Sequence, residues 1–318
     1  MLLSCSLMFL SCPFPHSQAF LYAIANGAEY IFDFDDDNEL LNKVDLFELT
    51  TAKAGAAGGV KVRVPETKCS AFNPYESFEA TASGMWARGV PLDDINTCRA
   101  ERYCEATLNE PDVTVGVYQS LANHDPDVDA IWRLTREIPV DFKPNPQVPP
   151  LAIPTGAFSP FNAQATIFHR SAFWGLFLPT TVHSRVSDIW RSYFDQALFR
   201  HSGIALVFVD PLVVQHRNAH SYLADFDSEK PLYERAGELV RYLSQWEPPR
   251  AAASSANAFA GAYEKLYIDL YEHGIIELED VQLAQEWMLT LQGMGYKFPE
   301  LKEKATTLIG CNKNQKVN

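Results

Sequence analysis

An apolar run that leads directly into four carboxylates is the strongest constraint on this chain. The segment 30–38 starts with strand-forming residues and then carries Asp33, Asp35, Asp36 and Asp37. If the strand continued, Asp33, Asp35 and Asp37 would share one face and Asp36 the other. Like charges this close repel one another unless a positive group lies among them. A divalent cation fits, because oxygen ligands bind such ions and leave room for substrate phosphates.

The same run permits other interpretations. It can be a solvated turn, since Asp37-Asn38 is good turn chemistry. An EF-hand loop starting at Asp33 is excluded, because it needs Gly and Glu where this chain has Asn38 and Val44. A phosphatase with an aspartyl nucleophile usually has Thr or Val where this chain has Asp37, which weakens that interpretation. The third candidate is the Asp-x-Asp element of nucleotide-sugar glycosyltransferases, where a divalent ion bridges carboxylates to a diphosphate.

Composition limits the class of protein. The chain has 318 residues, 47% of them hydrophobic with 20 Phe and 13 Tyr, which is ample for a folded core of one or two domains. Its net charge of −14 argues against nucleic-acid binding but allows an anionic nucleotide if a metal supplies local positive charge. Cys98 and Cys104 lie close in sequence, so either a local disulfide or free buried thiols are expected.

Hydrophobic periodicity predicts several elements. Five segments have helical spacing, and the run 204–209 resembles a buried strand. Gly203 can end the helix before that strand. Residues 225–228 supply capping candidates for the helix that follows them. The predicted helices are 18–26, 184–201, 231–246, 263–272 and 279–292.

Several ordered segments resemble the STELLO family of Golgi glycosyltransferase-like proteins. The resemblance extends over roughly residues 18 to 247. A further likeness, in 188–193, is to the Asp-x-Trp helix of the reversibly glycosylated polypeptides, which carry a similar acidic triplet. The matching STELLO segments are 21–28 leading into 31–36, then 72–75, 86–92, 125–131 with 133–135, 171–175 and 187–191.

The resemblance implies a GT-A-like α/β fold, with a mixed sheet flanked by helices that binds a nucleoside-diphosphate sugar. We expect an atypical or disordered N-terminus at 1–17, the glycosyltransferase domain at 18–249, a helical extension at 250–312 and a disordered tail at 313–318. About 30 residues precede Asp33, too few for two βα units. The first βα units of the domain are therefore expected to be missing.

The resemblance also implies a Golgi protein held by a membrane anchor that this chain lacks. The predicted activity is metal-dependent sugar transfer to an unknown acceptor. The alternative is a non-catalytic scaffold on the same fold that supports assembly of a polysaccharide synthase complex with protein partners in the secretory pathway.

Candidate metal ligands follow from the acidic run and from the family. Asp33, Asp35, Asp36 and Asp37 would hold Mn or Mg against the diphosphate. His216 and His220 are further candidates, because GT-A enzymes often use a late histidine as a ligand. Ordinary surface histidines are the simpler interpretation of both.

Other polar residues are candidates for substrate contacts. Asp188 is the predicted general base or, equally, a cap at the start of its helix. Trp190 can stack on an acceptor sugar or belong to the core. Arg88 and Arg217 can pair with phosphate, and Arg88 can instead form a structural ion pair. Asn162 and Gln164, predicted to bind acceptor hydroxyls, lie in a stretch that also reads as a surface loop.

The alternating residues Asp125, Asp127 and Asp129 resemble a second metal site. We interpret them mainly as a turn at Pro126 followed by a helix cap.

Overall fold

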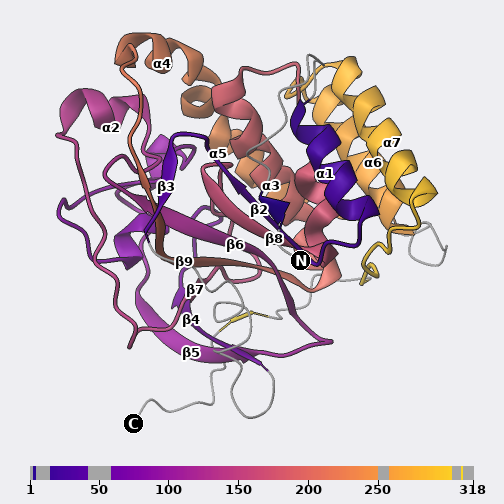
Figure 1. Cartoon of the computed structure of the whole chain (residues 1–318), viewed down its shortest axis with the longest axis horizontal. Coiled ribbons are helices and arrows are strands. Elements are labelled where there is room, and N and C mark those ends of the chain that lie inside the picture. Colours follow the sequence, from indigo (N-terminus) through magenta and orange to yellow (C-terminus); the bar gives the residue numbers. More distant parts are fainter. Residues whose placement is uncertain (1–2, 5–14, 42–58, 250–257, 303–308, 311–318) are drawn as a thin grey trace.

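The computed structural model describes residues 3–4, 15–41, 59–249, 258–302 and 309–310. These residues form a nine-stranded mixed sheet with helices packed against it (Figure 1). Strand β3 (Asn38–Leu40) pairs with β9 beside the main path of the sheet. The path runs β1 (Leu3–Ser4), β2 (Tyr30–Phe34), β8 (Ala165–His169), β6 (Thr114–Asn123), β9 (Ile204–Gln215), β7 (Leu151–Ala152), β4 (Val60–Glu66) and β5 (Arg102–Leu108).

The directions of the central strands bring several chain segments to one edge of the sheet. β8 is antiparallel to both β2 and β6, and β6 is parallel to β9. β2, β6 and β9 therefore all end at the edge where β8 begins. In open α/β sheets, ligands bind outside the carboxyl ends of the strands. The acidic run lies at this edge, directly after β2.

The helices are grouped mainly on one face of the sheet. Figure 1 shows α1, α3, α5, α6 and α7 gathered there, with α2 and α4 together near the edge where β2 ends. The helix bounds are α1 Pro15–Ala25, α2 Ala130–Thr135, α3 Ser184–Ser202, α4 Tyr222–Ser228, α5 Lys230–Gln245, α6 Ala258–Glu272 and α7 Leu278–Gly293.

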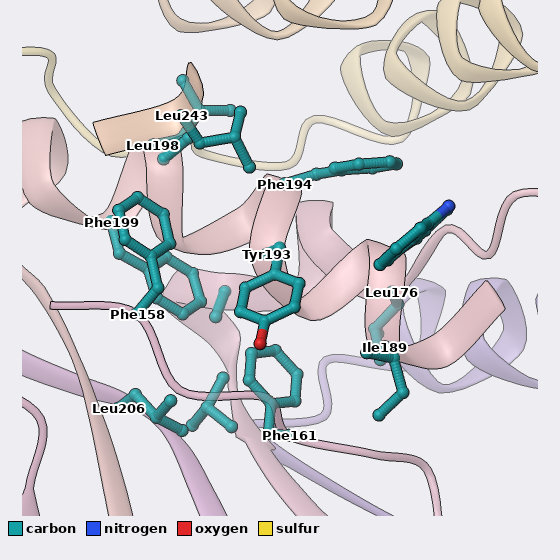
Figure 2. Packing of buried hydrophobic residues seen from close by; sticks show 14 of the residues in the cluster. Phe158, Phe161, Leu176, Ile189, Tyr193, Phe194, Leu198, Phe199, Leu206 and Leu243 are labelled. Atoms are coloured by element: carbon teal, nitrogen blue, oxygen red, sulfur yellow. The ribbon is translucent and has the colours of Figure 1, made fainter. Parts of the chain in front are cut away.

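Helix α3 is the centre of the helix-side core, and its apolar residues interlock with the sheet and with neighbouring segments (Figure 2). Tyr193 is fully buried, and its hydroxyl donates to the carbonyl of Gly89 at 2.8 Å. Trp190 is only 1% exposed and packs in the same cluster. Stacking of Trp190 on an acceptor sugar, one of the two sequence interpretations, is therefore wrong, because neither ring face is open to a ligand.

The predicted fold class, a mixed α/β sheet flanked by helices, is confirmed and is consistent with a GT-A-like fold. Four of the five predicted helices appear within three residues of their expected bounds, α6 begins five residues earlier than predicted, and Gly203 ends α3 with a φ of 70°. The strand predicted at 204–209 is longer, because β9 continues to Gln215. Residues 225–228 are not a cap for α5 but the last turn of α4.

Cys98 forms a disulfide with Cys69, which lies 29 residues earlier, so the predicted local pairing with Cys104 is wrong. The predicted N-terminal segment 1–17 and the tail 313–318 lie largely outside the described residues, and the domain boundaries remain predictions. Within the described part of the chain, every helix is too short or too polar to cross a bilayer.

Candidate functional site

A layer of buried polar side chains covers the sheet edge where β2, β6 and β9 end. The contributing segments are the turn after β2, the loop after β6, the loop before β8, the end of β9, the first turns of α3 and the loop around Arg88. The main-chain N–H of Arg88 donates to the carbonyl of Asp127 at 2.9 Å, which joins two of these loops directly.

Arg88 is the centre of this layer. Its Nε and Nη2 donate to the two carboxylate oxygens of Asp127 at 2.8 and 3.0 Å. Nη2 and Nη1 donate to the two oxygens of Asp188 at 2.9 and 3.2 Å, and Nη1 also reaches the carbonyl of Arg185. A guanidinium has five N–H donors, and these contacts occupy all of them. Arg88 is only 7% exposed.

These contacts overturn two predictions. Arg88 has no donor left for a phosphate, so its structural ion-pair interpretation is the correct one. Asp188 is not a helix cap, because His183 caps α3. Its oxygens also accept hydrogen bonds from the main-chain N–H of Ala163 at 3.2 Å and of Ile189 at 2.9 Å. With both oxygens engaged in this way, Asp188 is unsuited to act as the general base predicted from sequence and holds Arg88 in place instead.

The buried triad has the electrostatics of a stable ion pair. Burial alone would raise the pKa of Asp127, but the charge and hydrogen bonds of Arg88 hold it below its usual value. Burial alone would lower the pKa of Arg88, but Asp127 and Asp188 together hold it well above its usual value. Arg88 and Asp127 are therefore charged near neutral pH.

Asn162 and Gln164 support the triad from the loop before β8. The amide of Asn162 donates to Asp127 at 2.8 Å, and its oxygen accepts from Gln119 Nε2 at 3.0 Å. Gln164 donates to the carbonyl of Asp125 at 3.1 Å. Both side chains are buried, so the surface-loop interpretation and the prediction that they bind acceptor hydroxyls are wrong. They fix the loop geometry instead.

The acidic run forms the turn from β2 to β3. The N–H of Asn38 donates to the carbonyl of Asp35 at 3.2 Å, as the turn interpretation predicts. Asp36 is exposed, and Asp37 accepts from Gln215 Nε2 at 2.9 Å. Asp33 lies one row behind the edge, buried within β2 opposite Thr166. The strand ends at Phe34, so the aspartates do not share one extended face.

Asp35 carries the most unfavourable charge in the site. Burial and the negative charges of Asp127, Asp37 and Asp188 raise its pKa from 3.8 to about 7, while Arg217 lowers it. No hydrogen bond from a described residue reaches its carboxylate. A half-buried carboxylate in this position is the local feature that a bound cation would relieve.

Arg217 is a cation whose charge lowers the pKa of Asp35 and whose donors are not all occupied by described residues. Its Nη2 donates to Gln215 at 3.3 Å, and its Nε lies 3.8 Å from Asp125. The Nε atom is buried without a hydrogen-bond partner among the described residues. Asp125 itself is held by Arg133. Arg217 therefore retains donors for an anionic ligand, in contrast to Arg88.

The two candidate histidines differ in their surroundings: the main-chain N–H of His216 donates to the carbonyl of Asp37 at 3.3 Å, so His216 borders the acidic turn, whereas His220 contacts Asp225. The side chain of His216 is 59% exposed, its ring lies tilted against that of His124 at 4.9 Å, and it lies 3.9 Å from Glu39. The Nδ1 atom of His220 contacts Asp225, a residue also bound by Arg185. These positions favour the surface-histidine interpretation, and His220 is committed to an ion-pair cluster between α3 and α4.

The described residues hold no group of three or more His, Cys, Asp or Glu arranged to bind a metal ion. The described segments therefore offer no closed cage of ligands for a metal ion. Mg²⁺ and similar ions, however, are commonly bound by one or two carboxylates together with substrate phosphates and waters. Asp35 and Asp37 at one turn, with the raised pKa of Asp35, fit that more open kind of site.

Sequence reasoning missed Asp127. It assigned Asp129 correctly as the cap of α2, where the carboxylate accepts from the N–H of Trp132 at 2.8 Å. Asp127 was grouped with the same turn, although it is the bidentate partner of Arg88. The available signal was an alternating aspartate run directly after a strongly apolar segment, the same arrangement that marked residues 30–38.

Comparison with known proteins adds to this geometry. A family model described as STELLO glycosyltransferases matches residues 185–315. The chain is 30% identical over 292 residues to "Probable glycosyltransferase STELLO2" and 28% identical over 292 residues to "Probable glycosyltransferase STELLO1", both from Arabidopsis thaliana. The chain is related to the STELLO glycosyltransferases. The alignments cover 90% of this chain but only 36% of each relative.

The family match contains part of the polar layer. Arg185, Asp188 and Arg217 lie inside the matched range, whereas Asp35, Arg88 and Asp127 come earlier in the chain. The STELLO-like region thus meets the earlier segments at the sheet edge through the contacts of Arg88 with Asp188.

Gly89 sets the position of Arg88, which gives a first prediction. Gly89 has a φ of 94°, and a Cβ there would lie 2.3 Å from Ile189 Cγ2 on α3. We expect Gly89→Ala to destabilise folding by about 2–4 kcal/mol, because backbone strain and overpacking add together. Urea unfolding measures this. The matched control is Gly84→Ala, where φ is 68° and no atom lies within 4 Å. If Gly84→Ala lowered the free energy of unfolding as much as Gly89→Ala does, the close approach of Gly89 to Ile189 would not be the cause.

Proposed function

We propose that the chain carries the nucleotide-sugar site of a metal-dependent glycosyltransferase, at the sheet edge built around Asp35. The observation that carries the proposal is the half-buried carboxylate of Asp35, crowded by like charges and faced by the unsaturated Arg217. The kinship with proteins named as probable glycosyltransferases supports the reaction class. The proposed donor is a nucleoside-diphosphate sugar, bound with Mn²⁺ or Mg²⁺.

Each part of the site has a distinct task in this proposal. Asp35 and Asp37 would hold the ion, which when bound neutralises the charge that develops on the leaving diphosphate. Arg217 donates to diphosphate oxygens through its free N–H groups. Arg88 does not touch the ligand, but its bonds to Asp127 and Asp188 keep the walls of the site in register. Rigid support of this kind is what positions reacting groups.

The proposed location is the secretory pathway, in the Golgi. The disulfide between Cys69 and Cys98 supports it, since disulfides persist in oxidising compartments and are rare in the cytosol. The names of the relatives support the same class of protein without specifying the acceptor.

Calorimetric titration with uridine diphosphate tests the proposal. We expect binding that needs Mn²⁺ and that is weakened about tenfold or more in Arg217→Gln, because one charge-assisted contact to phosphate is lost. Arg102→Gln is the matched control, since this arginine lies exposed on β5 and pairs with Glu66. Binding that is absent, or that is equal with and without Mn²⁺, would contradict the proposal.

A non-catalytic scaffold is the second candidate, favoured by the saturation of Arg88 and Asp188 with internal hydrogen bonds. It predicts that a pull-down with Asp35→Asn recovers as much of a protein partner as a pull-down with the wild-type chain. Partner recovery that needs an intact Asp35 would count against the scaffold.

A further inference from the structure

A second pocket, lined by none of the residues proposed to bind the donor, has a different chemical character. It has a volume of about 400 Å³ and is bounded by four parts of the chain: Glu76, the loop from Gly84 to Trp86, the stretch from Leu92 to Arg99, and helix α2 with the residue after it. This volume is within the range of small-molecule sites. The residues that matter for its chemistry are Trp86, Ile95, Asn96, Arg99, Ile131 and Arg136. We call it the Trp86 pocket.

The walls of the Trp86 pocket are held in place by specific bonds. The indole N–H of Trp86 donates to Asp129 at 2.6 Å, and Asp129 also caps α2. The stretch that carries Asn96 and Arg99 is tied to residue 69 by the disulfide at Cys98. The half-buried Trp86 ring is therefore a fixed aromatic wall, since its polar end is already bonded inside the protein.

The lining of the pocket carries two arginines, Arg99 and Arg136, and one carboxylate, Glu76. Arg99 lies 3.4 Å from Glu76, which compensates part of its charge. Arg136 donates only to the carbonyl of its neighbour Thr135, at 3.0 Å, and no described carboxylate forms an ion pair with it. One guanidinium therefore remains available to a carboxylate, a group that arginine binds with matching two-pronged geometry.

An aromatic wall, an exposed amide and a free guanidinium together define a ligand. The negative face of the Trp86 indole suits the weakly positive C–H bonds on one side of a pyranose ring. Asn96 can both donate to and accept from hydroxyls. We propose that the Trp86 pocket binds an acidic sugar residue, a pyranose that carries a carboxylate, as part of the acceptor glycan. Its role as the acceptor depends on the function proposed above, whereas the binding itself does not.

The pocket and the Asp35 site share two segments, which fits adjacent subsites for one reaction. Trp86 and Arg88 lie two residues apart on one loop, and Asp127 and Asp129 lie two residues apart on another. Arg88 and Asp127 bond to each other within the Arg88 layer, whereas Asp129 holds the indole of Trp86, which lines the pocket. A glycan held at Trp86 therefore lies beside the site where the donor is proposed to bind.

Calorimetry with trigalacturonate on the full chain, in EDTA and without nucleotide, tests the inference. We expect trigalacturonate to bind and galactotriose, its neutral counterpart, to bind at least tenfold more weakly. Arg136→Gln removes the free guanidinium, so we expect about a tenfold loss for trigalacturonate, equal to about 1.4 kcal/mol. Arg102→Gln is the control for general surface charge and is expected to bind as the wild type does.

Three outcomes would overturn the inference: no binding of trigalacturonate, equal binding of the neutral sugar, or unchanged binding in Arg136→Gln. Competition by inorganic phosphate at the same concentration as the sugar would also overturn it, because the pocket would then be a general anion site. Uridine diphosphate binding with Mn²⁺ is measured on the same Arg136→Gln sample. It is also measured on the wild type, where absence of uridine diphosphate binding together with binding of trigalacturonate would contradict the proposed function and leave the sugar pocket standing.

Discussion

Arg88→Met is expected to destabilise folding by about 3–5 kcal/mol at pH 7.5, the largest effect of any single substitution at this site. The methionine fills much of the volume but leaves the carboxylates of Asp127 and Asp188 buried without their cation. Breaking one partner of a buried pair is more harmful than removing the whole pair, because the remaining charges cannot regain water. Urea unfolding followed by tryptophan fluorescence measures the difference in the free energy of unfolding.

The pH dependence distinguishes lost charge from lost packing. In the wild type, Arg88 keeps the pKa of Asp127 below its usual value, so this carboxylate stabilises folding above its unfolded pKa and loses that effect as pH falls. In Arg88→Met the buried carboxylates favour protonation, so the variant regains stability on acidification. We expect the difference in the free energy of unfolding between the wild type and Arg88→Met to shrink between pH 7.5 and 5. A difference in the free energy of unfolding that does not change with pH would indicate lost packing instead of lost charge. Arg102→Met, at an exposed arginine, is expected to leave the unfolding midpoint unchanged.

Asp35→Asn is expected to raise the stability of the metal-free protein while removing ligand binding. At pH 8 in EDTA the gain is on the order of 2–4 kcal/mol, because each unit of pKa shift corresponds to about 1.4 kcal/mol and solvent screening reduces the total. Burial and the charges of Asp127 and Asp37 raise the pKa of Asp35 to about 7. With Mn²⁺ and uridine diphosphate present, we expect the wild type to be stabilised and the variant to be unaffected.

The sign of this pH effect follows from the raised pKa. The folded protein favours the protonated form of Asp35, so the wild type loses stability as pH rises from about 4, the unfolded value, to about 7, the folded value. The difference in the free energy of unfolding between Asp35→Asn and the wild type should therefore be small at pH 4 and reach its full size above pH 7. Asp36→Asn, one residue along and exposed, is the matched control and should show no such gap. Equal behaviour of the two variants would contradict the crowding of charge at Asp35.

The sequence predicted the helices well because their apolar positions repeat with a fixed period. Helix α3 is the clearest case, with a regular apolar face and a glycine stop at Gly203. Strand β6 left no such signal, since it lies in the middle of the sheet and is buried on both faces. A fully buried strand lacks the alternation by which half-buried strands are found.

The candidate site was only partly predictable, because its decisive contacts join residues far apart in the chain. The acidic run was found from local pattern, and the proposal still depends on it. Arg88 lies 39 residues from Asp127 and 100 residues from Asp188, so no local pattern distinguishes a phosphate-binding arginine from one that is saturated internally. Trp190 has helical spacing in either role, and only packing shows that it belongs to the core.

Crystals of the chain grown with Mn²⁺ and uridine diphosphate provide the most direct test of the Asp35 site. Anomalous scattering locates manganese independently of any assumption about its ligands. We predict an ion bound by carboxylate oxygens of Asp35 and Asp37 at about 2.1 Å and also by diphosphate oxygens, with Arg217 donating to the diphosphate. Nucleotide bound at this edge without manganese, or manganese bound away from Asp35, would contradict the account.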